Sequence, residues 1–278
     1  MTIWVDGALV DDDAARISPM DHGLLTGDGV FETLRVYDGV PFAWTRHVAR
    51  LGRSAGALGL VPPGDAELRA AADAVIAANG LPDARLRITV TGGVAPLGSE
   101  RGTVPPTVVI ASGPLASWPP TADVVTVPWC RNERGATAGL KTTSYAENVR
   151  ALAHAHARGA GEAIFPNTRD ALCEGTGSNV FVVVDGALVT PPLASGCLAG
   201  VTRDVVLLLC ERNDIACAET DLPIGALATA EEAFLTSSTR EVQPIARVDG
   251  HELPRAPGPV TLALQSAWRD LLTRDLDP

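Results

Sequence analysis

The stretch GLKTTSYAENVR, residues 139–150, contains Lys141, the only lysine among 278 residues. The other 21 basic side chains are arginines. Arginine serves as well as lysine for surface charge, but a guanidinium stays protonated and cannot condense with a carbonyl. A partly buried ε-amine can lose its proton and form a Schiff base. The lone lysine therefore indicates an amine kept for chemistry, and the alternative is a leftover surface residue in a chain of biased composition.

The composition is that of a globular, acidic protein. Hydrophobic residues make up 46% of the chain and charged residues 20%, which excludes a disordered chain. At 278 residues the chain is long enough for one large domain or two medium ones, and we expect two. No basic block offsets the formal net charge of −11, so we expect neither nucleic acid nor an anionic membrane as a partner.

The cysteines, the histidines and the N-terminus bear on metals and compartment. The five cysteines form no CxxC pair and lie near no ligand-spaced histidines, so neither a zinc site nor a disulfide framework is indicated. His154 and His156 lie two apart on an expected helix and face different directions, so we expect no metal there. The start, MTIWVDGALV, lacks the regions of a signal peptide, and no apolar run approaches the about 18 residues of a membrane-spanning helix. We therefore expect a soluble, cytoplasmic protein.

Residues 1–113 predict an N-terminal α+β domain. Thr45 and Asp65 are the expected N-caps of two amphipathic helices, and Asn79-Gly80 ends the second. The expected strands of this domain lie at 30–36, 86–92 and 105–112. Four Asp-Gly pairs, at 6–7, 38–39, 185–186 and 249–250, follow apolar stretches and predict type I′ hairpin turns.

The segment 114–121 is the expected linker, because its prolines interrupt both helix and strand pairing. We expect a larger C-terminal domain over 122–278. Its expected elements are strands at 123–129, 161–167 and in 234–245, an apolar run at 172–184, and helices at 146–159, from near Thr202 and at 259–272.

Side chains of four kinds suit one ligand. Lys141 offers a Schiff base. Hydroxyls and backbone amides at a helix start or strand end hold a phosphate monoester, an arginine adds a cation, and a carboxylate keeps a ring nitrogen protonated. The candidates are Thr202, Ser237, Ser238, Arg50 and Glu174. Each has an ordinary explanation when taken alone, as an N-cap, a strand end, a surface cation or a loop carboxylate. Together they are what pyridoxal 5′-phosphate (PLP) requires.

The chain resembles the fold-type IV PLP enzymes, which include branched-chain and D-amino-acid aminotransferases and 4-amino-4-deoxychorismate lyase. The segments that carry the resemblance are DGVFETLRVYDG, HVARL, LKTTSY, CEGTGSNVF, LAGVTRD and FLTSSTREVQPIARVDG, in that order along the chain. The resemblance implies an α+β fold with a small N-terminal α+β domain and a larger C-terminal α/β-barrel-like domain. It also implies a homodimer with shared active sites.

The resemblance assigns roles to individual residues. Lys141 is similar to the Schiff-base lysine, Tyr145 to the tyrosine near the cofactor's phenolic oxygen, and Glu174 to the partner of the pyridine nitrogen. The other residues implied to bind the cofactor, several of them through its phosphate, are Arg50, Asn179, Val201, Thr202, Ser237 and Ser238.

Within this family the sequence favours an aminotransferase that uses D-amino acids or (R)-amines with a keto-acid acceptor. Glu32 resembles the D-amino-acid branch, and Thr33 resembles the lyase branch; both are candidate substrate contacts. The arginine-histidine pair of D-amino-acid aminotransferases is absent where RLRITVTGG stands, and Arg101 is the candidate substitute for binding the substrate carboxylate. The alternative is 4-amino-4-deoxychorismate lyase, and a branched-chain L-amino-acid aminotransferase ranks third.

Overall fold

The computed structural model describes residues 1–278 as two compact units. The first unit comprises residues 1–116, 140–145 and 276–278, and the second comprises 117–139 and 146–275. The expected linker, 114–121, spans the first change of unit. The lysine segment, expected in the C-terminal domain, instead belongs to the first unit, as do the last three residues.

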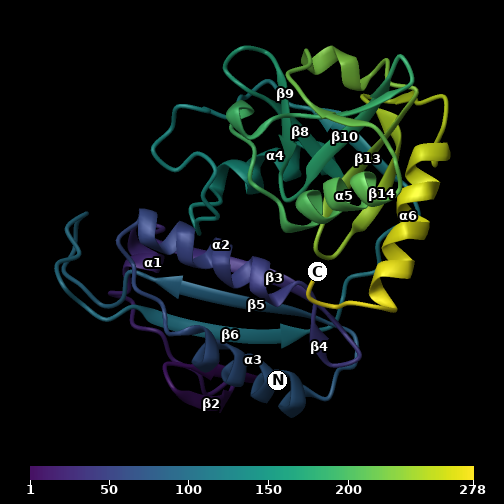
Figure 1. Cartoon of the computed structure of the whole chain (residues 1–278). Coiled ribbons are helices and arrows are strands. Elements are labelled where there is room, and N and C mark those ends of the chain that lie inside the picture. The colour runs from purple at the N-terminus through teal and green to yellow at the C-terminus, as the bar shows by residue number, and fades with distance from the viewer. The chain divides into compact units, whose positions relative to one another are not determined.

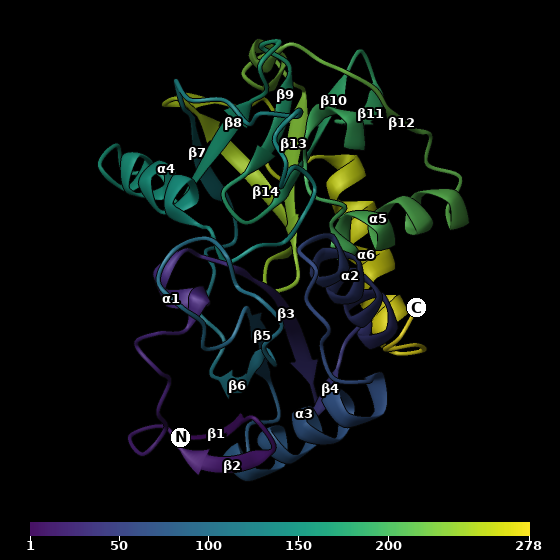
Figure 2. The same ribbon diagram turned by 90° about the vertical axis from the view of Figure 1, so that its left-hand side faces the viewer.

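The first unit contains a six-stranded antiparallel sheet with strand order β2-β1-β6-β5-β3-β4. Its elements are β1 (Thr2–Val5), β2 (Ala8–Asp11), α1 (His22–Leu25), β3 (Gly29–Tyr37), β4 (Val40–Pro41), α2 (Trp44–Ala57), α3 (Asp65–Asn79), β5 (Ala84–Thr91) and β6 (Thr107–Gly113). Helices α2 and α3 run along one face of this sheet (Figures 1 and 2).

Strand β3 gives the two faces of this sheet different characters. Val30, Leu34 and Val36 are fully buried in the core that α2 and α3 cover. Glu32 shares their face, because side chains alternate along a strand, and it too is fully buried. Phe31 belongs to the opposite face, which neither helix covers. A carboxylate on the apolar face needs partners there, and α2 supplies them.

The lysine segment extends the sheet along the edge of β3. The amide of Phe31 donates to the carbonyl of Lys141 at 3.0 Å, and the amide of Thr143 donates to the carbonyl of Gly29 at 2.8 Å. Thr143 Oγ1 also donates to the carbonyl of Gly27 at 2.9 Å. These backbone hydrogen bonds place the segment in the first unit, although about 110 residues separate it from β3 along the chain.

The expected N-caps of α2 and α3 were wrong. Helix α2 begins after Ala43, whose φ is 52°, and the amide and hydroxyl of Thr45 donate to the carboxylate of Asp277 at 2.9 and 2.6 Å. Helix α3 begins after Gly64, and Asp65 instead accepts a hydrogen bond from the Trp44 indole at 2.7 Å. A side chain from the end of the chain thus replaces the local cap at α2.

The second unit contains a nine-stranded mixed sheet with order β12-β11-β10-β13-β14-β7-β8-β9, and β15 pairs with β14. Its strands are β7 (Ala122–Thr126), β8 (Glu162–Pro166), β9 (Leu172–Gly175), β10 (Asn179–Val184), β11 (Ala187–Thr190), β12 (Cys217–Glu219), β13 (Glu232–Ser237), β14 (Glu241–Val248) and β15 (His251–Glu252). Its helices are α4 (Ala146–His156), α5 (Val201–Arg212), α6 (Pro259–Leu272) and the short 3-10 helices η1 (Leu193–Ser195) and η2 (Ile224–Leu227).

The core of the second unit follows from the apolar strands. Val124, Ile164, Val180 and Leu235, from four different strands, belong to one buried cluster. A separate buried cluster joins Ala151 and Ala155 of α4 to residues of β7 and β8. The packed strands position candidate residues at their ends, because Glu174 lies in β9, Asn179 begins β10 and Ser237 ends β13. Val201 and Thr202 begin α5.

The four Asp-Gly pairs that were predicted to form hairpin turns do so. Both residues of each pair have positive φ, from 44° to 101°, and each pair joins two antiparallel strands. No helix of the chain is both long enough and apolar enough to cross a membrane. No group of three or more histidine, cysteine, aspartate or glutamate side chains is arranged to hold a metal ion.

Candidate active site

Lys141 lies on the face of the first sheet that the helices leave uncovered. Its Nζ lies 4.4 Å from the centroid of the Phe31 ring, and its amide donates to Ser54 Oγ of α2 at 3.2 Å. Tyr145, four residues later, packs edge to face against the same ring with centroids 5.3 Å apart. The lysine amine and the tyrosine thus both contact one aromatic residue of β3.

Arg87 of β5 belongs to the same cluster and was missed by the sequence reasoning. Its guanidinium carbon lies 3.8 Å from the Phe31 centroid, and its Nε donates to Thr89 Oγ1 at 3.1 Å. Its register partner on β3 is Thr33, so both side chains lie on the uncovered face. No carboxylate of the chain forms an ion pair with Arg87. The cluster therefore places a guanidinium and the lysine amine on the same aromatic ring.

The helix-covered face holds a buried triad of charged and polar side chains. Glu32 accepts from Arg50 Nε and Nη2, both at 2.7 Å, and from His47 Nδ1 at 2.7 Å. Because Glu32 is fully buried and both of its oxygens are engaged, it does not present its carboxylate to a substrate, contrary to the expectation. It instead fixes the plane of the Arg50 guanidinium.

The charges of the triad shift two pKa values. Burial raises the pKa of Glu32, but the adjoining Arg50 and His47 more than offset burial, and the pKa lies well below its usual range. Burial lowers the pKa of His47 below 6.5, and the positive charges of Arg50 and Lys141 lower it further against the opposing effect of Glu32. The triad at neutral pH is an ionised carboxylate, a neutral imidazole and a guanidinium.

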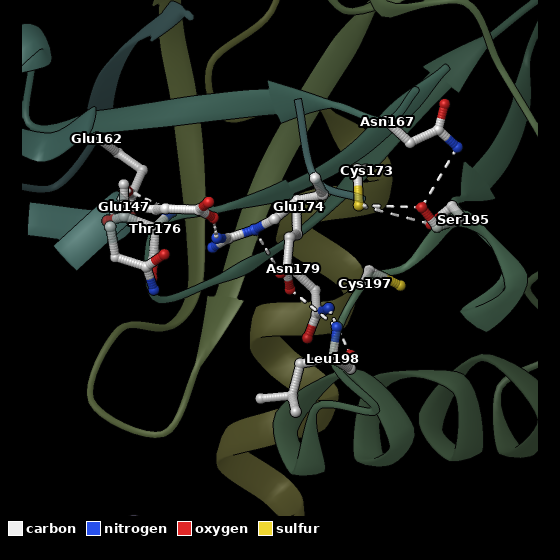
Figure 3. A network of polar contacts seen from close by, with 12 residues as sticks. Glu147, Glu162, Asn167, Cys173, Glu174, Thr176, Asn179, Ser195, Cys197 and Leu198 are labelled. Atoms are coloured by element: carbon white, nitrogen blue, oxygen red, sulfur yellow. Dashed lines mark hydrogen bonds and ion pairs between the residues drawn. The ribbon is translucent and has the colours of Figure 1, made fainter. Parts of the chain in front are cut away.

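Glu174 occupies the centre of a polar network in the second unit (Figure 3). Its Oε1 accepts from Arg131 Nε at 3.1 Å, and its Oε2 accepts from the amide of Leu198 at 2.9 Å. The guanidinium of Arg131 also stacks on the Phe165 ring, 4.1 Å from its centroid. These contacts hold the carboxylate in one orientation. Sequence reasoning gave no signal for Arg131.

The start of α5 is tied to this network. Asn179 Nδ2 donates to the carbonyl of Leu198 at 2.9 Å, and a Cβ at position 200 would overlap Asn179 Oδ1, which requires Gly200. Gly200 is the N-cap and provides no side-chain acceptor, so no side chain caps the first turn, where Val201 and Thr202 lie. An uncapped helix start is suited to an anion.

The remaining candidates lie at two places. Ser237 is the last residue of β13 and Ser238 follows it in the turn to β14, and Ser237 Oγ accepts from the amide of Arg240 at 3.2 Å. Arg101, in the first unit, forms an ion pair with Asp28 at 2.6 Å and donates to the carbonyl of Leu58 at 2.7 Å. Arg101 is thus already engaged within its own chain, which weakens its candidacy as the carboxylate anchor.

Two cysteines lie beside the Glu174 network. Cys173 Sγ donates to the carbonyl of Ser195 at 3.4 Å (Figure 3). Burial, and secondarily the Glu174 carboxylate, raise the pKa of Cys173 far above its usual range and that of Cys197 to about 11. Both thiols are protonated at neutral pH, so neither is a nucleophile here.

The sequence of the chain matches a known family over most of its length. Residues 29–248 match the family model described as amino-transferase class IV. The chain belongs to the class IV aminotransferases. The resemblance seen in the sequence is thereby confirmed, and the enzyme uses PLP.

Two relatives show which activities occur among similar class IV aminotransferases. A Methanocaldococcus jannaschii protein, provisionally named as a branched-chain-amino-acid aminotransferase, is 35% identical over 283 residues, covering 99% of this chain and 97% of its own. The D-alanine aminotransferase of Bacillus licheniformis is 32% identical over 277 residues, covering 97% and 96%. Both relatives are matched nearly end to end, so sequence similarity alone does not separate the two substrate classes.

Solved structures confirm the fold class expected from the sequence. The T.th. branched-chain amino acid aminotransferase, complexed with N-(5′-phosphopyridoxyl)-L-glutamate, has a TM-score of 0.91 at 28% identity, covering 98% of this chain and 94% of its own. A Legionella pneumophila protein, provisionally named 4-amino-4-deoxychorismate lyase, has a TM-score of 0.88 at 26% identity, covering 94% and 97%. The chain is therefore a fold-type IV enzyme.

The residues of this class IV aminotransferase fit the PLP that its family requires. PLP carries a phosphate dianion, a basic ring nitrogen and an aldehyde. The uncapped start of α5 with Thr202 suits the dianion, and the carboxylate of Glu174, held by Arg131 and the Leu198 amide, suits a protonated ring nitrogen. The one primary amine of a side chain, Lys141, suits the aldehyde.

Proposed function

We propose that this enzyme transfers the amino group of a D-amino acid, or of a related (R)-amine, to a keto acid. The cluster on the uncovered face of the first sheet supports an amino acid as the substrate. That cluster contains an amine, Lys141, and a guanidinium without a carboxylate partner, Arg87, on one aromatic ring. An amino acid needs both, an amine for its α-proton and a cation for its carboxylate.

Lys141 is the proposed base of the reaction. Bound PLP supplies an electron sink for the carbon that loses its proton. With PLP and the amino donor bound, the Nζ of Lys141, as an unprotonated free amine, would remove the α-proton of the donor. Phe31 restricts the lysine side chain, because its ring lies 4.4 Å from Nζ, and Tyr145 packs against that ring.

The proposed cofactor contacts divide by chemistry. Glu174 holds the ring nitrogen protonated, and Arg131 orients the carboxylate of Glu174. Arg50, oriented by Glu32, is a cation for the phosphate. The remaining proposed phosphate contacts are Val201, Thr202, Ser237 and Ser238, and Asn179 is a further proposed cofactor contact.

The preference for D-amino acids rests on the resemblance of GDGVFETLRV around Glu32 to that branch, and on the B. licheniformis relative. A branched-chain L-amino-acid aminotransferase is the rival that the M. jannaschii relative favours. The lyase is favoured by Thr33, which lies opposite Arg87 on the uncovered face, and by the L. pneumophila structure. A homodimer with shared active sites and a cytoplasmic location complete the proposal.

One set of reactions separates these possibilities. The purified enzyme is incubated with D-alanine, D-glutamate, (R)-1-phenylethylamine and L-leucine in turn, and the absorption of the cofactor is followed. We expect the D-amino acids to convert PLP to its pyridoxamine form and to require a keto acid for turnover. Conversion by L-leucine alone would favour the branched-chain activity. Release of pyruvate and 4-aminobenzoate from aminodeoxychorismate, without an acceptor, would favour the lyase.

The role of Lys141 has its own test. Treatment of the wild-type enzyme with borohydride should attach the cofactor covalently to a peptide that contains Lys141, as mass spectrometry of a digest will show. Lys141→Ala should abolish the adduct. An adduct that persisted in this variant would have to involve the N-terminal amine and would overturn the assignment.

A further inference from the structure

Glu162 is a buried carboxylate, 1% exposed, that the proposed chemistry does not use. It is the first residue of β8. Its Oε1 accepts from the amides of Ala163 and Thr176, both at 3.0 Å, and from Thr176 Oγ1. Its Oε2 accepts from Ser178 Oγ at 3.1 Å and pairs with Arg240 Nη2 at 3.3 Å. One carboxylate therefore holds two separate loops.

The first of these is the ring-nitrogen loop, residues 174–179, which begins with Glu174 and ends with Asn179. It is tightly wound, because the amide of Gly175 donates to the carbonyl of Ser178 at 2.7 Å. A Cβ at Gly175 would overlap Ser178 Oγ and lie 3.2 Å from the carboxyl carbon of Glu162. The loop thus lies directly against Glu162, with no space for a larger residue at position 175.

The second is the phosphate loop, residues 237–241, which contains Ser237 and Ser238. Arg240 anchors it, since its amide donates to Ser237 Oγ at 3.2 Å and its Nη1 donates to Gln243 Oε1 at 2.6 Å. Its guanidinium also stacks 3.7 Å above the Trp118 ring. The side chain of Arg240 is 7% exposed, so the ion pair with Glu162 is a buried one.

We propose that Glu162 is a positioning residue that joins the ring-nitrogen loop to the phosphate loop and so sets the spacing of Glu174 and Ser238 before PLP binds. This inference rests on the proposed function. PLP is a rigid ligand whose ring nitrogen and phosphate must be met at a fixed separation. Holding both loops in advance removes the cost of ordering them when PLP binds. Residues that never touch the cofactor thereby determine its affinity.

The test variant is Glu162→Gln. In the wild type, Oε2 of Glu162 accepts from both Ser178 and Arg240. The amide nitrogen of glutamine cannot accept a hydrogen bond, and the substitution also removes the negative charge opposite Arg240. Glu232→Gln is the matched control. Glu232 is also 1% exposed, and it accepts from the amides of Val260 and Thr261 and from Thr261 Oγ1, at the start of α6. These contacts belong to neither loop.

Dissociation constants are measured for apo-enzymes with PLP and with pyridoxal, which lacks the phosphate, beside thermal denaturation of each variant. We expect Glu162→Gln to raise the Kd for PLP by about tenfold or more, and to raise the Kd for pyridoxal much less, because pyridoxal does not use the phosphate loop. Glu232→Gln should lower the Tm but leave the ratio of the two Kd values as in the wild type.

Arg240→Met removes the ion pair between Arg240 and Glu162 from the side of the phosphate loop. This variant replaces Glu162→Gln as the test if Glu162→Gln does not fold. We expect Arg240→Met to raise the Kd for PLP relative to the Kd for pyridoxal, as Glu162→Gln does. The effect of the double variant, Glu162→Gln with Arg240→Met, should be smaller than the sum of the two single effects. An unchanged ratio in both single variants, or an equal change in Glu232→Gln, would overturn the inference. Failure of the wild-type apo-enzyme to bind PLP would instead overturn the proposed function.

Discussion

At the scale of the residue, Arg87 is the side chain most directly tied to the substrate. We expect Arg87→Gln to lower kcat/KM for D-alanine by about 10- to 100-fold, since a hydrogen bond to a charged group contributes about 1.5–3 kcal/mol. The amine (R)-1-phenylethylamine has no carboxylate, so its kcat/KM should change little. Steady-state kinetics with both donors measure the difference.

Arg85→Gln is the control for this prediction. Arg85 is an exposed arginine two residues before Arg87 on the same face of β5, and its register partner on β3 is Arg35 and not Thr33. Equal losses with D-alanine and with the carboxylate-free amine would show that Arg87 stabilises the lysine cluster and does not bind the substrate carboxylate.

Arg50 is the residue through which the buried triad would reach the cofactor. We expect Arg50→Ala to raise the Kd for PLP by about 10-fold or more, because it removes a charge-assisted contact and leaves His47 as the remaining partner of Glu32 in the triad. Arg53→Ala, which removes an exposed arginine one turn along α2, should leave the Kd unchanged. Equal dissociation constants for the two variants would contradict the assignment.

At the scale of the element, helix α2 carries both His47 and Arg50, so its first turn matters for the triad. The cap of that turn is Asp277, which accepts from the amide and hydroxyl of Thr45. We expect Asp277→Ala to lower the free energy of unfolding by about 1 kcal/mol, as for loss of an N-cap. Urea denaturation measures it, with Asp13→Ala, at an exposed aspartate of the first unit, as the control. Equal midpoints for these two variants would exclude a capping role.

The sequence predicted elements well where the deciding interactions are local. The Asp-Gly hairpins were correct because positive φ at both turn positions is a property of the two residues themselves. The bounds of α6 were correct because Pro259 starts the helix. The cap of α2 could not be predicted from Thr45 alone, because its partner Asp277 lies 232 residues away.

The difference between local and long-range interactions also explains which parts of the candidate site could be predicted from the sequence. The motif around Lys141 was visible in the sequence, but its position beside Phe31 depends on strand pairing across about 110 residues. Arg87 could have been suspected from alternation, since polar side chains at 85, 87 and 89 predict an open face of β5. The strand register that places Arg87 opposite Thr33 could not be predicted from the sequence. Burial of Glu32 likewise depends on α2.

At the scale of the whole molecule, the buried triad couples folding to pH. The pKa of His47 is lower in the folded chain than its ordinary value of 6.5, because burial and nearby cations disfavour the imidazolium. The unfolded chain therefore binds a proton that the folded chain does not as the pH falls below about 6.5. The pKa of Glu32 is also lowered, so its contribution is present above about 4.5 and is lost as the pH falls further.

As the pH falls, the folded chain therefore loses stability over two pH ranges. Protonation of His47 in the unfolded chain causes the first loss, and protonation of Glu32 causes the second at lower pH. We expect the free energy of unfolding to fall from pH 7 to pH 5, by at most about 1.4 kcal/mol per pH unit for one proton. In His47→Gln the imidazole is gone, so the loss between pH 7 and pH 5 should be smaller than in the wild type. Urea denaturation at half-unit pH intervals measures both curves. Parallel curves over this interval would show that His47 is not protonated preferentially in the unfolded chain, and the stability lost there would have to come from other groups.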